Sequence, residues 1–482
     1  MRPVQAITAT RERELKLSVG PDFALPELSG EQLTERVFDS IYYDTADRRL
    51  AGAGATLRRR IENGGALWQL KLPRGESRLE LELAGGPVPP EPILELLTTL
   101  VRGEELRPVS TLRTKRTGVR VRRDEQPIAD VVIDRVSVLE GQTVEASLDE
   151  VEIELVEGSE ADLERLERSL LRAGARKGAG NPKIFTALGI EPDEASPDGP
   201  ARSGVGAIQR RLREQYEEIV KHDPGTRLGS DPEDLHRFRV ATRRLRALLR
   251  SAGEALDPRW AKPLREELAW LADSLGAVRD LDVLLADLRA QAAQYRDADP
   301  VARERLFSVL EAERAAARGR MLGDLRSERY RAILTEIEKG IAALPVRWAD
   351  YSPENVVATE FRRLRSQMRA LGEAPDDDAL HRTRISGKRA RYAAELAGPA
   401  LGKAGSRFVK RAKAFQDLVG EHQDAVIAEE RLLEAATRLR DPGAAFIAGR
   451  LAEWQTHRRR TAREALPKTW ASLEKSGLQL LR

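Results

Sequence analysis

The chain contains no cysteine among its 482 residues, and this absence removes two classes of structure. Disulfides cannot form, and structural zinc sites built on thiolates are excluded. Aromatic residues make up only 5% of the chain, which leaves few side chains for stacking on nucleic-acid bases. We find no signal peptide and no apolar run near the roughly 20 residues that a membrane-spanning helix needs. We therefore expect a cytoplasmic protein.

The net charge is small as well, although charged residues are abundant. Asp, Glu, Lys and Arg form 33% of the chain, yet the formal net charge is only +3. A charged ligand would therefore be attracted by local clusters of charge and not by the total charge. Hydrophobic residues, at 41%, suffice for sizeable cores in two or three domains. Metal sites built from oxygen ligands stay compatible with this composition.

The composition changes near the middle of the chain. Residues 1–190 contain short alternating runs separated by glycine pairs and prolines, which predict strands joined by turns. Residues 191–204 are polar and proline-rich and predict a linker. Residues 205–482 are rich in Ala, Leu, Arg and Glu at helical spacing. We therefore predict an α+β multidomain protein, in which an antiparallel β tunnel or barrel precedes an all-α domain.

The elements of the N-terminal half can be placed by these patterns. The expected strands are residues 11–19, 37–43, 55–61, 66–72, 78–83, 111–122, 128–139 and 150–156. The expected helices lie near residues 91–101 and 160–173.

Charged residues alternate along several of these strands. Glu12, Glu14 and Lys16 share one face, because successive side chains of a strand point to opposite faces. Such a face is unfavourable in an apolar core and is expected where it lines a wet cavity. The alternative is solvent-exposed strands whose charges pair across the sheet, but the recurrence of the pattern favours a cavity. The predicted inward-facing residues are Glu12, Glu14, Lys16, Arg58, Arg60, Lys71, Glu80, Glu82, Arg113 or Arg116, Asp134, Glu152, Glu154 and Lys183.

Both signs of charge are present in this set, and the combination indicates a ligand class. Arg and Lys side chains bind phosphate oxygens, and carboxylates bind Mg²⁺ or Mn²⁺ that bridges to those oxygens. The pattern therefore predicts a site for a polyanion together with a divalent metal. Such a site could activate water and neutralise charge on a transferring phosphoryl group.

The segment Glu12-Arg13-Glu14-Leu15-Lys16 resembles the ExExK signature of the CYTH superfamily, the triphosphate tunnel metalloenzymes. The resemblance covers roughly residues 8–190. It includes Tyr42-Tyr43-Asp44-Thr45, Leu57-Arg58-Arg59-Arg60, Leu70-Lys71-Leu72-Pro73, the pair Glu80 and Glu82, Arg113-Thr114-Lys115-Arg116, Asp130 with Asp134, the pair Glu152 and Glu154, and Pro182-Lys183. Asn181-Pro182-Lys183 departs from the more usual Ser-Lys-Tyr but keeps the lysine.

The resemblance implies an eight-stranded antiparallel tunnel and a role for each charged residue. The residues implied in substrate binding are Lys16, Arg58, Arg60, Lys71, Arg113, Arg116 and Lys183. Those implied in metal binding are Glu12, Glu14, Asp134, Glu152 and Glu154. Those implied in catalysis are Glu12, Glu14, Lys16, Glu80 and Glu82. Members of the family include inorganic triphosphatases, thiamine triphosphatases and class IV adenylate cyclases. We favour inorganic triphosphate, because no pattern here specifies an adenine or thiazolium pocket.

The C-terminal half contains a repeated basic segment. His236, Arg239, Arg243 and Arg246 lie at offsets that form one stripe of an α-helix. The same offsets recur in a second segment at His381, Arg384, Lys388 and Arg391. Like charges in a stripe repel one another, so a duplicated stripe predicts an anionic partner. The alternative is a solvated basic face with salt bridges along the helix. Zinc is not favoured, since neither histidine has a ligand at the fourth position after it.

These segments are similar to the CHAD domain, the conserved histidine α-helical domain, over almost all of residues 205–482. The resemblance implies two helical bundles, about residues 205–345 and 346–482, around a pseudo-two-fold axis. It also implies that the eight residues of the two stripes bind inorganic polyphosphate. Nucleic acid is disfavoured as a partner because no base-reading motif or aromatic platform accompanies the arginines.

The two halves thus predict the same ligand class. Our leading hypothesis is a metal-dependent inorganic triphosphatase whose helical domain binds polyphosphate and would allow association with polyphosphate granules. One alternative is a polyphosphate-binding or granule-associated protein without catalysis, and another is a class IV-type adenylate cyclase. Domain docking and oligomeric state are not specified by these patterns.

Overall fold

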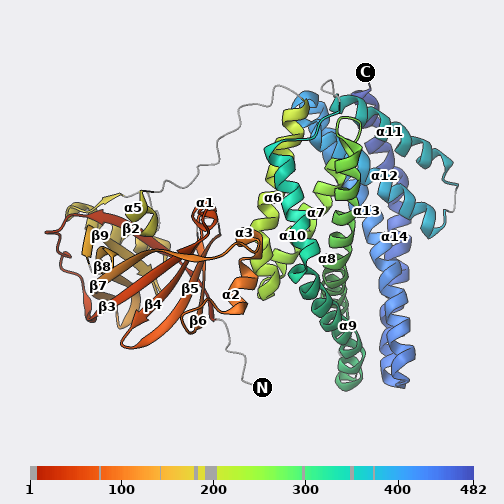
Figure 1. The fold of residues 1–482 in the computed structure, drawn as a ribbon. Coiled ribbons are helices and arrows are strands. Elements are labelled where there is room, and N and C mark those ends of the chain that lie inside the picture. The colour runs from red at the N-terminus through yellow and green to blue at the C-terminus, as the bar shows by residue number, and fades with distance from the viewer. Residues whose placement is uncertain are drawn as a thin grey trace. The chain divides into compact units, whose positions relative to one another are not determined.

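The computed structural model describes residues 8–74, 77–141, 143–177, 183–189, 204–295, 299–347, 352–372 and 375–481. The chain divides into two compact units, Met1–Pro197 and Asp198–Arg482. Figure 1 shows that the first is built on a β-sheet and the second on helices, which confirms the predicted α+β class. The predicted linker, except for its last residue, falls outside the described residues.

The first unit contains one antiparallel sheet with the order β1-β6-β5-β4-β3-β7-β8-β9-β2-β10. The strands are β1 (Thr8–Glu12), β2 (Glu14–Val19), β3 (Gly30–Asp44), β4 (Thr56–Glu62), β5 (Gly65–Arg74), β6 (Ser77–Ala84), β7 (Arg107–Arg123), β8 (Gln126–Glu140), β9 (Thr143–Leu155) and β10 (Arg176–Lys177). The helices are α1 (Arg49–Gly52), α2 (Glu91–Leu96), α3 (Thr98–Val101), α4 (Glu160–Arg172) and α5 (Lys183–Leu188).

The sheet is not a closed barrel, which corrects one part of the prediction. Its end strands, β1 and β10, do not pair with each other. The expected first strand is instead interrupted at Arg13: β1 pairs with β6, and β2 pairs with β9. Because β1 and β2 are consecutive in the chain, the sheet is bent round so that β6 and β9 approach each other.

The alternating sequence of β9 is explained by what lies on each face of the sheet. Val151 and Ile153 are fully buried in a core cluster with Leu163, Leu166 and Leu170 of α4. Residues at the intervening positions must point to the opposite face, into the curl of the sheet. The helix α4 thus covers the apolar face and leaves the charged face inward. A capping box at its start, formed by Ser159 and Asp162, stabilises this helix.

The second unit is all-α in its described residues. Its helices are α6 (Gly204–Leu228), α7 (Pro232–Ser251), α8 (Pro258–Ala292), α9 (Pro300–Arg326), α10 (Glu328–Ala342), α11 (Pro353–Ala370), α12 (Asp377–Leu396), α13 (Gly398–Leu439) and α14 (Pro442–Leu480). No helix in the described part of the chain is both long and apolar enough to cross a bilayer.

Several apolar clusters hold these helices together. One cluster joins α6, α7, α8, α9 and α10 around Phe238 and Tyr330. Another joins α11, α12, α13 and α14 around Phe361, Phe408 and Phe415. A further cluster joins α8 and α9 to α13 and α14. The helices α7 and α12, which carry the two basic stripes, pack against each other. Both begin at an aspartate cap, Asp231 for α7 and Asp376 for α12.

Candidate functional site

The curled sheet encloses a charged cavity of about 210 Å³. Eight of its lining side chains are cationic and four are carboxylates, so the wall is positive by four charges. The lining residues are Lys16, Arg36, Tyr42, Thr56, Arg58, Arg60, Gln69, Lys71, Arg78, Glu80, Glu82, Arg116, Glu152, Glu154 and Lys183. An excess of positive charge that still contains carboxylates suits a polyanion bound with a metal ion.

Strand register brings the carboxylates of β9 against the lysine of β2. Glu14 lies opposite Glu154, and Lys16 lies opposite Glu152. The Lys16 ammonium forms an ion pair with Glu152 and lies 3.4 Å from Glu14 Oε2. It also lies 3.8 Å from Glu150 Oε1. One lysine is therefore shared among three carboxylates.

A second cluster of opposite charges lies beside the first. Arg116 of β7 donates two hydrogen bonds to Asp134, each 2.7 Å, and one of 3.1 Å to Glu154. The helix α5 is short, but Ile184 and Phe185 bury it against Tyr42 and the sheet. This packing places the buried Lys183 ammonium against Asp134, 3.1 Å from Glu150 Oε1.

Burial and these ion pairs set the protonation of the acidic groups. Burial disfavours the charged form of Glu152, but Lys16, Lys183 and Arg116 outweigh it and hold its pKa well below the usual range. Burial raises the pKa of Glu150, and the charge of Glu152 acts in the same direction, against the two lysines. Glu152 is thus a permanent anion at neutral pH, whereas Glu150 takes up a proton more readily.

The cationic side of the cavity is formed by β3 and β4. Arg58 donates to Gln69 Oε1 at 2.7 Å and to the Tyr42 hydroxyl at 3.2 Å. Arg60 and Arg36 share one carboxylate, that of Glu62. Burial, together with the charges of Arg36 and Arg58, lowers the pKa of Arg60. Arg60 thus lies close to two further arginines, an arrangement that suits an anion site.

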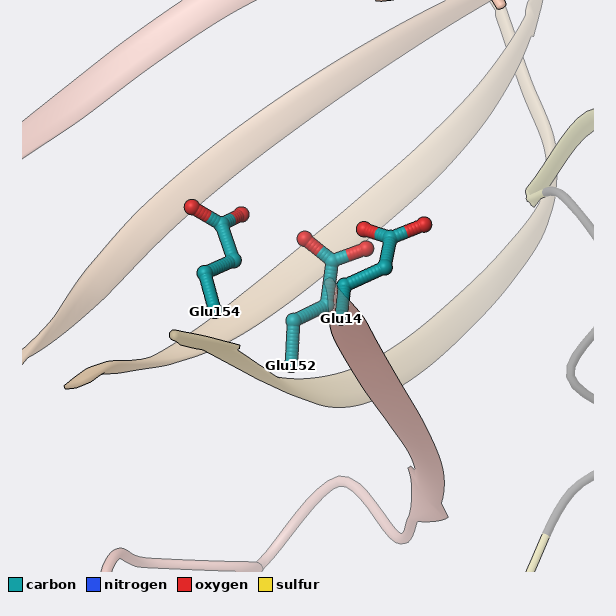
Figure 2. A group of neighbouring side chains, drawn as sticks. All are labelled: Glu14, Glu152 and Glu154. Carbon is teal, nitrogen blue, oxygen red and sulfur yellow. The ribbon is translucent and has the colours of Figure 1, made fainter. Parts of the chain in front are cut away.

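Among the described residues, two sets of carboxylates could hold a divalent cation, and they share Glu152. Oxygens of Glu14, Glu152 and Glu154 lie within 4.8 Å of one another, as do those of Asp134, Glu150 and Glu152. Figure 2 shows the first three carboxylates projecting to the same side of β2 and β9. A donor set of carboxylates alone suits a hard cation such as Mg²⁺ or Mn²⁺.

Most of the predicted inward residues are found together at this cavity. Lys71 lies 3.5 Å from Glu80 Oε2, and Gln69 donates to both Glu80 and Glu82. Arg113 is an exception and a correction: its side chain is about half exposed and is held by Asp39 at 2.8 Å. It lies an odd number of residues from Arg116, so the two point to opposite faces of β7. The side chain of Glu12 falls outside the described residues, although its backbone pairs with Arg78.

Several residues of the site were missed by the sequence patterns. Glu150 continues the alternation of Glu152 and Glu154 backwards by one step and could have been found by extending it. Arg78 precedes Glu80 and Glu82 in the same way. Arg36 gave no such signal, because it lies in a part of β3 that precedes the expected strand.

In the helical unit, the two basic stripes meet in one cluster. We call Arg239, Arg243, Arg384 and Lys388 the central basic cluster. Burial, and then the charges of Arg243, Arg384 and Arg239, lower the pKa of Lys388 to about 7. Burial also lowers the pKa of Arg239, whose neighbours include Arg243 and Arg384. Four cations from α7 and α12 are therefore crowded in a partly desolvated place.

The remaining residues of the stripes lie around this cluster. His236 lies near Arg279, and burial together with that charge lowers its pKa. His381 Nδ1 lies 3.1 Å from Gln423 Oε1. Arg246 lies near Arg250, whose pKa is lowered by burial and by neighbouring arginines. Arg391 instead lies 3.4 Å from Glu395 and over the ring of Tyr392.

Comparison with known proteins agrees with this geometry. The sequence profile of the CYTH domain matches residues 10–181, and that of the CHAD domain matches residues 210–433. The chain is also 30% identical to the uncharacterized protein Rv2226 of Mycobacterium tuberculosis over 525 residues, which cover 98% of this chain and 99% of that protein. The chain belongs to the CYTH–CHAD family. A CYTH–CHAD relative from another strain of the same organism, the uncharacterized protein MT2285, is 29% identical with the same coverage.

Solved structures resemble one or other part of this CYTH–CHAD protein. PptA from Streptomyces chartreusis is 23% identical, with a TM-score of 0.49, and the match covers 56% of this chain and 99% of that one. The CHAD domain from the plant Ricinus communis is 26% identical, with a TM-score of 0.47, over 56% of this chain and 91% of that one. HpAC1 from Hippeastrum is 16% identical, with a TM-score of 0.25, over 37% and 97%, and its structure is described as revealing a dominant triphosphatase activity.

Proposed function

We propose that the β unit is a divalent-metal-dependent hydrolase of inorganic triphosphate and that the helical unit binds inorganic polyphosphate. The observation that carries the first part is the cavity wall, in which eight cations and four carboxylates face one space. An anion-binding site without metal chemistry has no use for a row of carboxylates. The CYTH superfamily, to which residues 10–181 match, consists of metal-dependent enzymes of this class.

The charged residues of the cavity would have separate roles in substrate binding and catalysis. Arg58, Arg60 and Arg36 would bind phosphate oxygens, since all three line the cavity and the charges of Arg36 and Arg58 act on Arg60. Lys16, Arg116 and Lys183 would stabilise charge that develops on the phosphate during transfer. When bound, the metal ion would neutralise phosphate oxygens and lower the pKa of a bound water.

The set of Glu14, Glu152 and Glu154 is our choice for the metal. Two of its members line the cavity. In the other set, Asp134 already accepts two hydrogen bonds from Arg116 and an ion pair from Lys183. Glu150, whose pKa burial raises, would be available to hold a proton or orient water. Glu80 and Glu82 would contribute through Gln69 and Lys71 at the adjoining wall.

The second part of the proposal rests on the central basic cluster. A chain of phosphates carries closely spaced negative charges that would match cations contributed by two helices. Residues 1–190 would then form the catalytic domain, and residues 205–482 the polyphosphate-binding domain with its two repeats. Binding to polyphosphate would also place a cytoplasmic enzyme at polyphosphate granules.

The test is phosphate release from tripolyphosphate, ATP, thiamine triphosphate and long-chain polyphosphate, each with Mg²⁺, Mn²⁺ or EDTA. We expect metal-dependent release from tripolyphosphate above the other substrates and none in EDTA. Release from no substrate, with polyphosphate still bound, would make the chain a binding protein. Formation of cyclic AMP and pyrophosphate from ATP would instead make it a cyclase.

A further inference from the structure

Two carboxylates stand at equivalent positions beside the arginines of the central basic cluster. On α8, Asp280 follows Gly276 by one helical turn, and on α13, Asp424 follows Gly420 by the same spacing. A Cβ built at Gly276 would lie 3.5 Å from Arg239 Nε, and one at Gly420 would lie 3.9 Å from Arg384 Nε. Each repeat therefore places an arginine over a glycine and an aspartate one turn further on.

The carboxylates interact with the same arginines that would bind phosphate. Asp280 Oδ1 accepts a hydrogen bond of 2.9 Å from Arg239 Nη2. Asp424 and Asp280 both lie close enough to Arg384 for their negative charges to stabilise its charged form. Partial desolvation raises the pKa of Asp424, and the charges of Glu421 and Asp280 act in the same direction, against Arg384. The two aspartates thus lie near each other across the junction of the two repeats.

These contacts leave the arginines only partly satisfied. The Nε atoms of Arg239 and Arg384 are buried and have no hydrogen-bond partner in the described structure. A phosphate group could supply that partner, but its charge would first have to displace or repel the neighbouring carboxylate. Exchanging one carboxylate–arginine contact for one phosphate–arginine contact adds little to the binding free energy, because the two interactions are similar. A chain of phosphates that reaches both arginines makes two such exchanges within one binding event.

We infer that Asp280 and Asp424 are residues of the helical anion site that limit its affinity, each competing with phosphate for the arginine of its own repeat. A short anion meets one of these carboxylates, whereas a long polyanion meets both, so that the two aspartates together lower the affinity for the long chain. This inference rests on the proposed binding of polyphosphate by the helical unit. In this inference the basic residues attract the anion, and the aspartates compete with it.

The test uses the full chain with D280N, D424N and the double variant, and isothermal titration with pyrophosphate and with long-chain polyphosphate at fixed ionic strength. Each single variant should bind the long chain about threefold to tenfold more tightly. The two gains should multiply in the double variant for the long chain. For pyrophosphate, which reaches one half of the site, the double variant should gain no more than about twofold over the better single variant.

Asp287 supplies a matched control. It lies on α8 two turns beyond Asp280, and its carboxylate is held by Arg458 at 2.6 Å. Asp287→Asn removes the same charge from the same helix and should change the affinity less than about twofold. Gains of equal size in this control and in D280N would show a general charge effect and overturn the inference.

Other outcomes separate this inference from the function on which it rests. Tight binding by the wild-type chain with no gain in D280N or D424N would overturn the inference alone. Weaker binding in these variants, seen only with Mg²⁺ present, would show that the aspartates hold a metal and would also overturn it. If neither the wild-type chain nor any variant bound polyphosphate at low salt, the proposed function of the helical unit would fail as well.

Discussion

Lys16 of β2 and Glu152 of β9 are direct partners in the strand register, and their side chains form an ion pair inside the cavity. Glu152 is almost completely buried, and it is also the carboxylate common to both potential metal sets. Any ion that binds there must share Glu152 with Lys16, Lys183 and Arg116. This arrangement makes Glu152 the most informative single position for testing the proposed chemistry.

Glu152→Gln should reduce metal-dependent phosphate release at least about 100-fold, because it removes a charge common to both carboxylate sets. Initial rates with tripolyphosphate and Mg²⁺ or Mn²⁺ measure the effect, and circular dichroism confirms that the variant is folded. Glu164→Gln is the control, since Glu164 is an exposed residue of α4 on the far side of the sheet. Comparable rates in both variants would refute the catalytic role of Glu152.

Two arginines of the same sheet should differ in their effect on substrate binding. Arg60 lines the cavity, whereas Arg113 is bound to Asp39 on the outer face. Arg60→Ala should raise KM for tripolyphosphate about tenfold or more, because a desolvated arginine–phosphate contact is lost. Arg113→Ala should leave KM within about twofold, as expected for an exposed ion pair. Equal changes in KM would mean that the cavity does not bind the substrate.

Metal binding should distinguish the two carboxylate sets. Glu154→Gln should weaken Mn²⁺ binding at least about tenfold, because it removes a proposed ligand. Glu150→Gln should change it much less, since Glu150 belongs to the set whose Asp134 is held by Arg116 and Lys183. Titration followed by electron paramagnetic resonance measures free Mn²⁺ without requiring activity. The opposite order of the two effects would move the metal to the second set.

Polyphosphate binding should depend on pH through Lys388. Burial and the charges of Arg243, Arg384 and Arg239 lower its pKa to about 7, so the free protein loses this charge as the pH rises through that value. Bound phosphate favours the protonated lysine, and binding above about pH 7 must therefore take up a proton. Affinity should be highest below about pH 7 and fall as the pH rises toward about 9.

The matched variant for this prediction is Lys388→Arg, because arginine keeps its charge throughout this range. Titration calorimetry in buffers of different ionisation enthalpy measures the proton uptake. The variant should show a flatter pH profile and less proton uptake than the wild-type chain. Asp424, Arg243 and Arg384 stay in place in both proteins, so an unchanged profile would assign the pH dependence to another group.

The order of the elements and most of the cavity could be predicted from local sequence. Period-two alternation places Lys16, Glu152 and Glu154 on inward faces without any knowledge of the sheet order, because a strand allows only two side-chain directions. Helical spacing likewise places Arg239 and Arg243 on one stripe. Arg113 shows the limit of this approach, since a motif resemblance included it although its parity differs from that of Arg116.

The sequence by itself determined which faces are charged, because alternation and helical period are properties of neighbouring residues. Only the tertiary structure decided which of these faces meet. The interruption at Arg13 lets β1 pair with β6 and β2 with β9, so residues far apart in the chain share one cavity. The packing of α7 against α12 similarly joins the two basic stripes. Burial, together with repulsion from the neighbouring arginines, lowers the pKa of Lys388 there. Strand order, register and helix packing depend on contacts between distant segments, and no local pattern encodes them alone.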